Sequence, residues 1–178
     1  MLIRPARAQE YAQIGELSVR VYLAEGYTRA DSHYPTVLRD VAGRAAQAEV
    51  MVAVDESDRL LGTVTYAGGG SAYAETARGA DEAGFRMLVV DPAARGRGVG
   101  RALVDWCVRR AERDGARVLR LSTQSAMTAA GRLYERLGFV RTPDLDWSPE
   151  PGVRLITYEL VLERPRTAGG DPATRSSR

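Results

Sequence analysis

The sequence predicts a mixed α/β fold, in which a central twisted sheet of six to seven strands, mixed in direction, packs against about four helices. Three observations predict it. Strand-like apolar stretches alternate with stretches of helical periodicity. Two of the strand-like stretches flank a short turn, which favours an antiparallel hairpin. An apolar strand, a helix and another strand follow one another over residues 85–121, which favours a parallel pair with a helical crossover.

The elements of the N-terminal half follow from local patterns. Pro5 marks the first strand as an edge or strand-end position, because proline cannot donate to a sheet ladder. Gly26 is a plausible stop for the first helix. The turn DESD separates two runs that are rich in β-branched residues. The predicted elements are a strand at 2–7, helices at 9–25 and 34–47, hairpin strands at 50–54 and 60–66, and a loop at 67–82.

The C-terminal half contains the clearest helices. Apolar residues recur at helical spacing in two segments that end at Gly115 and Gly138. The predicted elements are strands at 85–90, 118–121, 139–141 and 153–162, helices at 99–113 and 127–137, and a loop at 142–152. We expect one domain over residues 1–162 and a disordered tail over residues 163–178, whose composition is polar and rich in Gly, Pro and Ser.

Composition excludes several function classes. The net charge of +2 gives no case for a nucleic-acid partner, and the absence of lysine excludes Schiff-base and Walker-A chemistry. No apolar run approaches the ~20 residues of a membrane helix, and the N-terminus lacks the apolar region of a signal peptide, so we expect no membrane partner and a cytoplasmic location. One histidine and one cysteine, Cys107, predict no metal site and no internal disulfide; Cys107 lies on an apolar helical stripe and is expected to be buried and inert.

Glycine and arginine alternate in the segment RGRGVGR, between a predicted strand and a predicted helix. The first N–H groups of a helix have no partner inside it, and the helix dipole makes them attractive to anions. Glycine lets the backbone approach an anion closely, and arginine adds bidentate phosphate recognition. Residues 95–101 therefore predict a phosphate or pyrophosphate site.

Spacing separates three ligand systems that use this chemistry. A P-loop requires a lysine that the chain lacks. A dinucleotide-binding GxGxxG counted from Gly96 meets Arg101 in place of its third glycine, and Arg120 stands near the position of the expected acidic residue. A nucleotide-binding domain is thereby disfavoured. The remaining spacing, R-x-x-G-x-G, is typical of a loop that binds the pyrophosphate of coenzyme A, and it is matched by Arg95, Gly98 and Gly100.

Two segments together resemble the GNAT superfamily of N-acetyltransferases: FRMLVVDPAARGRGVGRALV at 85–104 and AAGRLYERLGFVR at 129–141. The resemblance implies parallel strands that splay around a coenzyme A cleft, with acetyl-CoA as co-substrate. It further implies acetyl transfer to a primary amine by direct attack in a ternary complex. A non-catalytic module of the same fold that binds or senses acyl-CoA is the alternative. The residues implied in acetyl-CoA binding are Leu88, Val89, Val90, Arg95, Gly96, Arg97, Gly98, Val99, Gly100 and Arg101.

The resemblance also implies two catalytic residues. Tyr134, within LYERLGF, matches the tyrosine that commonly protonates the departing thiolate, and a phenol held within hydrogen-bond reach can serve as that acid. Glu82, near the start of the strand before the loop, is the expected base, with Glu75 and Asp81 as neighbouring carboxylates. The chain departs from the pattern of some peptide-acetylating members, because Ser122 stands at the position of their glutamate and Met127 at that of their asparagine.

The acceptor is expected to be a small-molecule or peptide amine. By the resemblance, its site lies between the two N-terminal helices and near the loop at 142–152. The residues expected to line it are Tyr27, His33, Tyr34 and Trp147. The resemblance leaves a homodimer open.

Overall fold

The computed structural model describes residues 1–162, which contain one eight-stranded sheet and five α-helices. The strands are β1 (Leu2–Pro5), β2 (Glu49–Val54), β3 (Leu60–Gly68), β4 (Glu82–Val90), β5 (Val118–Gln124), β6 (Val140–Arg141), β7 (Trp147–Glu150) and β8 (Val153–Val161). The helices are α1 (Tyr11–Ala24), α2 (Tyr34–Arg39), α3 (Val41–Ala45), α4 (Val99–Arg113) and α5 (Thr128–Arg136), with short 3-10 turns η1 (Ala8–Glu10), η2 (Pro92–Ala94) and η3 (Pro143–Leu145). The predicted tail at 163–178 lies outside the described residues.

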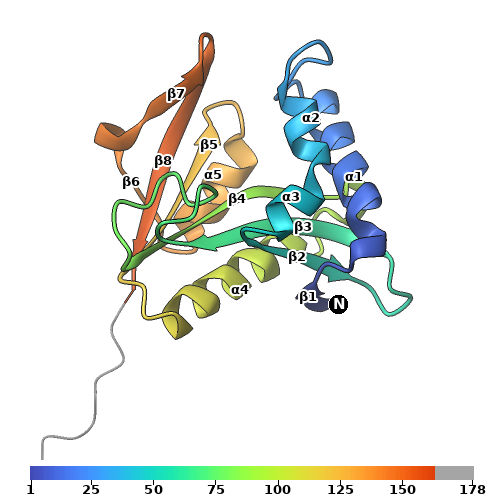
Figure 1. Cartoon of the computed structure of the whole chain (residues 1–178), viewed down its shortest axis with the longest axis horizontal. Helices are drawn as coiled ribbons and strands as arrows, with labels where there is room; N and C mark the ends of the chain where they lie inside the picture. Colours follow the sequence, from blue (N-terminus) through green and yellow to red (C-terminus); the bar gives the residue numbers. More distant parts are fainter. Residues whose placement is uncertain (163–178) are drawn as a thin grey trace, which may run out of the picture.

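The sheet is mixed, which confirms the predicted fold class. Its strand order is β1-β2-β3-β4-β5-β8-β6, and β7 pairs with β8 (Figure 1). Only β4 and β5 run parallel; the other pairs within residues 1–162 are antiparallel. The parallel pair is joined through α4, as the strand–helix–strand pattern predicts.

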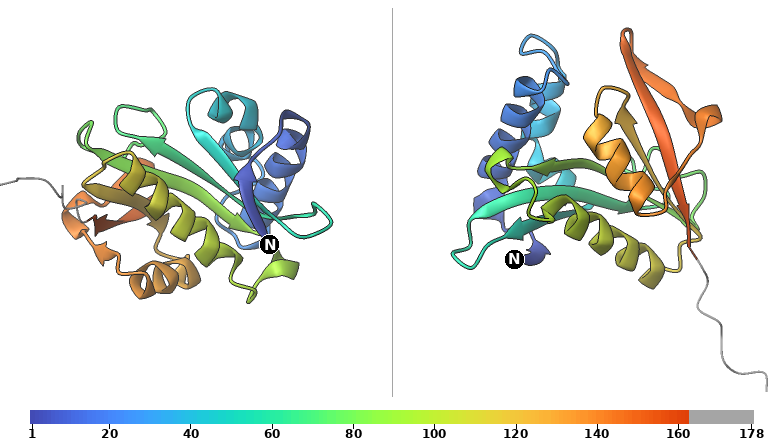
Figure 2. Two further views of the ribbon diagram at one scale, coloured as in Figure 1. Left: turned by 90° about the horizontal axis from the view of Figure 1, so that it is seen from below. Right: turned by 180° about the vertical axis from the view of Figure 1, so that it is seen from behind.

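Helices cover both faces of the sheet (Figure 2). On one face, α1, α2 and α3 enclose an apolar cluster around Ile14 and Leu38, and on the other face α4 packs a second cluster around Leu103 and Cys107. Cys107 is fully buried, and this burial raises the pKa of its thiol, so the thiol stays protonated. No helix within residues 1–162 combines the length and the apolar character that crossing a membrane would require.

The helix predicted at 34–47 is wrong in one respect, because the structure divides it into α2 and α3 at Asp40. Asp40 leaves the helical conformation, and its carboxylate accepts a hydrogen bond from the N–H of Gly43 at 2.9 Å. An aspartate that caps a following turn offers the backbone an alternative to a continuous helix. The apolar periodicity continues across the break, so the sequence pattern hides it.

The segment predicted as a loop at 142–152 contains a strand, β7. It forms a hairpin with β8, in which Trp147 lies opposite Leu155 and Glu150 opposite Val153. Its prolines conceal the strand in the sequence, although proline is tolerated on an edge strand. In Figure 1 this hairpin and the connection between α1 and α2 rise on the same side of the sheet, with a gap between them.

Two irregularities of β4 shape the centre of the molecule. First, β4 pairs with β5 only through residues 82–84 and 118–120, so the two strands separate beyond that point. Secondly, Met87 and Leu88 both lie opposite Val64 of β3, which is a β-bulge, and Met87 has a φ of 52°. A positive φ on a side chain of this size is rare, and bulges are enriched beside active sites, where they redirect side chains.

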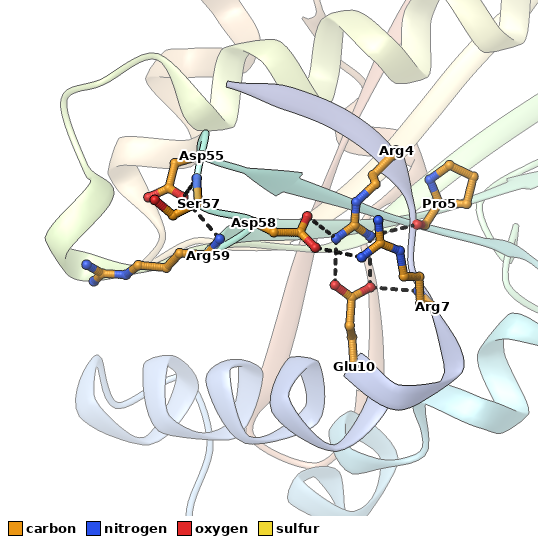
Figure 3. Close-up of polar contacts among 8 residues, drawn as sticks. All are labelled: Arg4, Pro5, Arg7, Glu10, Asp55, Ser57, Asp58 and Arg59. Atoms are coloured by element: carbon orange, nitrogen blue, oxygen red, sulfur yellow. Dashed lines mark hydrogen bonds and ion pairs between the residues drawn. The ribbon is translucent and has the colours of Figure 1, made fainter.

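A network of paired charges holds the N-terminus to the β2–β3 turn (Figure 3). The Arg4 guanidinium donates to Glu10 at 2.6 and 2.8 Å and to Asp58 at 2.7 Å. Arg7 donates to the other Asp58 oxygen at 2.6 Å, and its backbone N–H donates to Glu10 at 2.7 Å. The hydrogen bond from Arg4 holds the pKa of Glu10 below its usual value. Two guanidinium groups are thus balanced by two carboxylates.

Candidate active site

The glycine–arginine loop leads directly into α4. Gly98 is the residue before the first turn of α4, with a φ of 77°, and Gly96 has a φ of 74°. A Cβ on either would meet no atom within 4 Å, so the left-handed backbone, and not crowding, favours glycine there. The N–H groups of the first turn of α4 have no acceptor within the helix. Residues 96–101 therefore form an exposed N-terminal helix mouth of the predicted kind.

The arginines of this loop differ in their partners. Arg95 forms an ion pair with Glu25 at the end of α1 (2.9 Å), which fixes the loop against that helix. Arg101 is 3.5 Å from Asp105 on the next turn of α4. Arg97 is exposed and has no ion-pair partner within residues 1–162. A phosphate at the helix mouth would therefore meet Arg97 without a competing carboxylate, whereas it would share Arg101 with Asp105.

A cavity of about 730 Å³ extends between the separated strands. Most of its wall comes from β4 between Phe85 and Leu88, the end of β5, the connection between α1 and α2, and the β7–β8 hairpin, and α5 and the loop before β4 add to it. Of the residues predicted to bind acetyl-CoA, Leu88 lines this cavity, whereas Val89, Val90 and residues 95–101 do not. Because β4 has no strand partner on its β5 side beyond Gly84, its main chain is available there for hydrogen bonds to a ligand.

Tyr134 also lines this cavity. Its ring packs against Phe85 at 5.9 Å, Tyr158 at 5.8 Å and Phe139 at 6.0 Å between ring centroids. Its side chain is almost fully buried, and its hydroxyl has no hydrogen-bond partner within residues 1–162. Burial raises the pKa of Tyr134, so the phenol keeps its proton at neutral pH. The ring is fixed by packing, and the hydroxyl is left available to a ligand.

Glu82 does not join Tyr134 in the cavity. It lies where β4 and β5 are still paired, and it is buried. Its carboxylate forms an ion pair with Arg120 and accepts a hydrogen bond from the N–H of Arg78 at 2.6 Å. The role of Glu82 as the base stays a prediction. Its ion pair with Arg120 links β4 to β5 where the two strands are still paired.

The four residues predicted to contact the acceptor, Tyr27, His33, Tyr34 and Trp147, all line the cavity. They do so from opposite sides, because the first three belong to the α1–α2 region and Trp147 to the β7–β8 hairpin. Tyr22 of α1 lies behind two of them, with ring centroids 6.0 Å from Tyr27 and 5.7 Å from Tyr34. The structure thus brings together residues more than 110 positions apart, as Tyr34 and Trp147 illustrate.

Comparison with known proteins identifies the family of the chain. Residues 13–139 match the model of the acetyltransferase (GNAT) family. The chain belongs to the GNAT family. The match includes both the glycine–arginine loop and Tyr134, so the residues that carried the resemblance lie within the matched region, apart from Val140 and Arg141.

Two curated GNAT relatives match parts of the chain. Mycothiol acetyltransferase of Geodermatophilus obscurus is 44% identical over 62 residues, which are 34% of this chain and 20% of that protein. The [ribosomal protein bS18]-alanine N-acetyltransferase of Escherichia coli is 35% identical over 92 residues, which are 51% of this chain and 62% of that protein. The matches therefore cover a fifth of one relative and less than two thirds of the other.

A solved structure extends the GNAT likeness over almost the whole chain. A Salmonella typhimurium protein, whose structure was determined with its cofactor acetyl-CoA, aligns with a TM-score of 0.66 and 23% identity. The alignment covers 97% of this chain and 98% of that one. At this level of identity the likeness establishes the GNAT fold, and no substrate follows from it.

One ion pair in the cavity was not predicted from the sequence. Arg86 on β4 and Glu75 in the loop before it both line the cavity and form an ion pair with each other. The signal for Arg86 was present, since it is the one charge within the apolar run FRMLVV. No comparable signal marks Glu75, which lies in a loop among other polar residues. Within residues 1–162 no group of three or more metal-ligating side chains is brought together.

Proposed function

We propose that the protein is an acetyl-CoA-dependent N-acetyltransferase that acts on a primary amine by direct attack in a ternary complex. The observation that carries the proposal is the cavity between the separated parallel strands β4 and β5, with a tyrosine hydroxyl in its wall that has no protein partner within residues 1–162. The glycine–arginine mouth of α4 follows β4 in the chain through η2. Membership of the GNAT family supports the same reaction class.

Acetyl-CoA suits the residues that are present. The N–H groups at residues 96–101, with Arg97 and Arg101, would hold its pyrophosphate, and the free main-chain edge of Leu88–Val90 would hold its pantetheine arm. The thioester supplies an activated acetyl group. The open space around Gly96 and Gly98 leaves room for phosphate oxygens next to the backbone.

The chemical step requires one bond to form and one to break. The neutral amine attacks the thioester carbon, an N–C bond forms, and the C–S bond breaks. We assign polarisation of the carbonyl oxygen to main-chain N–H groups at the bulge, residues 87–89. Tyr134 donates its proton to the departing sulfur, and the proton lost by the amine passes to a base. The raised pKa of Tyr134 ensures that the phenol carries its proton when the sulfur departs.

For the base, geometry favours Glu75 over Glu82. Glu75 lines the cavity, whereas Glu82 is occupied by Arg120 at the closed end. Burial raises the pKa of Glu75, and Arg86 beside it only partly opposes that shift. A carboxylate with a raised pKa accepts a proton from an ammonium group more readily than an ordinary one.

A non-catalytic acyl-CoA-binding module is the second candidate, and one observation favours it. The expected base, Glu82, is engaged by Arg120, and the chain carries Ser122 and Met127 where some members carry a glutamate and an asparagine. Such a module would bind acetyl-CoA in the same cleft without turning it over.

One paired experiment distinguishes the candidates. Calorimetry measures acetyl-CoA binding, and release of free thiol measures turnover in the presence of a broad panel of amines. The enzyme proposal predicts binding in the micromolar range common for enzyme substrates, together with amine-dependent thiol release. Binding without thiol release for any amine would establish the non-catalytic module, and absence of binding would contradict both.

A further inference from the structure

The acceptor end of the cavity contains an unusual balance of buried charge. Arg86 and Glu75 form an ion pair there, with side chains 21% and 29% exposed. The Arg86 guanidinium also lies over the ring of Tyr73, 5.9 Å from its centroid. Arg86 alternates along β4 with Phe85, which packs in the cluster on the α4 face, and Tyr34 stands close enough to Arg86 to influence its charge.

A second arginine, Arg44 of α3, lies behind this pair and is 1% exposed. Its guanidinium donates to the carbonyl oxygens of Val37 and Leu38 at 2.8 and 3.0 Å, and no carboxylate within residues 1–162 forms an ion pair with it. It is close enough to Arg86 for the two charges to repel. Burial lowers the pKa of Arg44, and the charge on Arg86 adds to that effect.

The other charges around the cavity are satisfied or lie in solvent. Arg29 pairs with Asp31 at 2.6 Å, and Arg154 approaches Asp146 at 3.4 Å. Glu150 is exposed at the tip of the β7–β8 hairpin. Close to Arg86, its half-buried guanidinium and the buried one of Arg44 share one paired carboxylate, that of Glu75, while Asp40 attracts Arg44 from a distance without forming an ion pair.

The network in Figure 3 shows what a closed arrangement of similar groups looks like in this protein. There, Arg4 and Arg7 are matched by Glu10 and Asp58. The Nε atoms of Arg4 and Arg86 both lack an acceptor within residues 1–162, so an unpartnered Nε does not distinguish the two sites. The two sites differ in the number of carboxylates that pair with their guanidinium groups. Buried charges are normally paired, so a surplus guanidinium charge beside a ligand cavity indicates an anionic ligand group.

We propose that the acceptor is a small amine that also carries a carboxylate, as an amino acid does, and that Arg86 binds this carboxylate. This inference rests on the proposed acetyltransferase function and names its substrate class. Arg86 lines the cavity and donates through one Nη atom to Glu75, and a guanidinium has further donors that suit a second carboxylate. Glu75 then faces the amine side of the same zwitterion. The charges of substrate and site complement each other, with the positive group near Glu75 and the negative group near Arg86.

The proposal is tested with the standard amino acids, each assayed beside its own primary amide. The amide keeps the amine and side chain but lacks the acid, and it also mimics the N-terminus of a peptide. With acetyl-CoA and wild-type protein, kcat/KM for the preferred acid should exceed that for its amide by about 10- to 100-fold, the range expected when a charge-assisted contact is lost. Equal or faster acetylation of the amides would overturn the proposal and would favour a peptide acceptor.

Two variants make the test specific to Arg86. Arg86→Gln should reduce the ratio of acid to amide to near 1, whereas Arg29→Gln should leave it unchanged, because Arg29 lines the same cavity but is already paired with Asp31. Since Arg86→Gln leaves Glu75 without its partner, the double variant Arg86→Gln/Glu75→Gln is compared as well. The affinity for acetyl-CoA, measured by calorimetry, reports whether each variant is folded.

The outcomes for the two proposals are distinct. If Arg86→Gln keeps the preference for acids, Arg86 is not the carboxylate site and the inference fails while the enzyme stands. If amines without an acid group are acetylated fastest, the substrate class is wrong although the acetyltransferase proposal is correct. If acetyl-CoA binds and none of the amino acids or amides releases thiol, the inferred acceptor class is overturned; the enzymatic function is overturned as well only when the broad panel of amines also fails.

Discussion

The donor and acceptor ends of the cleft are built in different ways. We propose that the donor end is assembled from one continuous stretch, residues 88–101, and that it binds mainly through backbone N–H groups at the helix mouth and the free edge of β4. The acceptor end is assembled from α1–α2, the loop before β4, β4 itself and the β7–β8 hairpin, and its binding groups are side chains.

This difference explains what each end can reveal. Backbone groups and glycines recognise a feature common to many ligands, a pyrophosphate, and they leave a compact motif in the sequence. Side chains gathered from distant segments can be exchanged one at a time, so the acceptor is encoded in tertiary structure. Arg86 and Glu75, 11 positions apart, meet only because the loop before β4 folds back over the strand. The sequence motif therefore predicts the acetyl donor, whereas the acceptor is inferred from the charged side chains around the cavity.

The largest expected effect comes from breaking the donor end with Gly98→Asp. A carboxylate about 4 Å from a phosphate charge costs roughly 4 kcal/mol at an effective dielectric constant near 20, so acetyl-CoA affinity measured by calorimetry should fall by more than about 100-fold. Gly115→Asp is the matched control, because Gly115 at the far end of α4 has a similar φ of 72° and equal open space. Equal losses in both variants would show that backbone strain, and not the helix mouth, sets the affinity.

Tyr134→Phe should produce the next largest effect. Removing a general acid typically costs about 100-fold or more in turnover, and the ring remains to fill the aromatic cluster. We therefore expect kcat to fall by about 100-fold while acetyl-CoA affinity stays unchanged. Tyr158→Phe is the control: its ring packs against Tyr134 but Tyr158 does not line the cavity, and full activity is expected. Unchanged turnover in Tyr134→Phe would remove this residue as the acid.

Glu75→Gln tests whether Glu75 accepts the proton of the amine. Because burial raises the pKa of Glu75, a base at this position loses its proton only above the pH of an ordinary glutamate, near ~4.3. Wild-type kcat/KM should therefore fall as the pH decreases through that raised pKa. The variant should lose about 10-fold in kcat/KM near neutral pH and should lack this acidic limb. An unchanged pH profile would indicate that another group or water accepts the proton.

Glu10→Gln should have the smallest effect, because it lies at neither end of the cleft. Its pKa is lowered by the hydrogen bond from Arg4, so its stabilising contribution is present above the pKa of the unfolded chain and is lost as the pH falls through the lowered value. Urea unfolding at pH 7 should show a loss of about 1 kcal/mol that shrinks toward pH 3. Activity should be unchanged; a large loss of activity would mean that the network reaches the cleft.

Much of the fold was predictable because local patterns and global structure agree. Apolar periodicity and a glycine at the end of the helix predict both the strand–loop–helix around Gly98 and the helix that carries Tyr134. Where the two levels compete, prediction failed. Asp40 breaks a periodic helix by capping the next turn, and β7 is concealed by the prolines around Trp147.

The site was predictable in the same uneven way. Tyr27, His33, Tyr34 and Trp147 line the cavity, and their contact with the acceptor stays a prediction. The bulge at Met87 could not be predicted, because it depends on the register with β3 and places a non-glycine residue at positive φ. The engagement of Glu82 with Arg120 likewise depends on the pairing of β4 with β5.

The most direct test of the central claim is a crystal structure of the protein with coenzyme A. The account predicts the pyrophosphate on the N–H groups of residues 96–101, the pantetheine arm between β4 and β5, and the thiol within hydrogen-bonding reach of the Tyr134 hydroxyl. Coenzyme A bound away from the α4 helix mouth, or a thiol directed away from Tyr134, would contradict it.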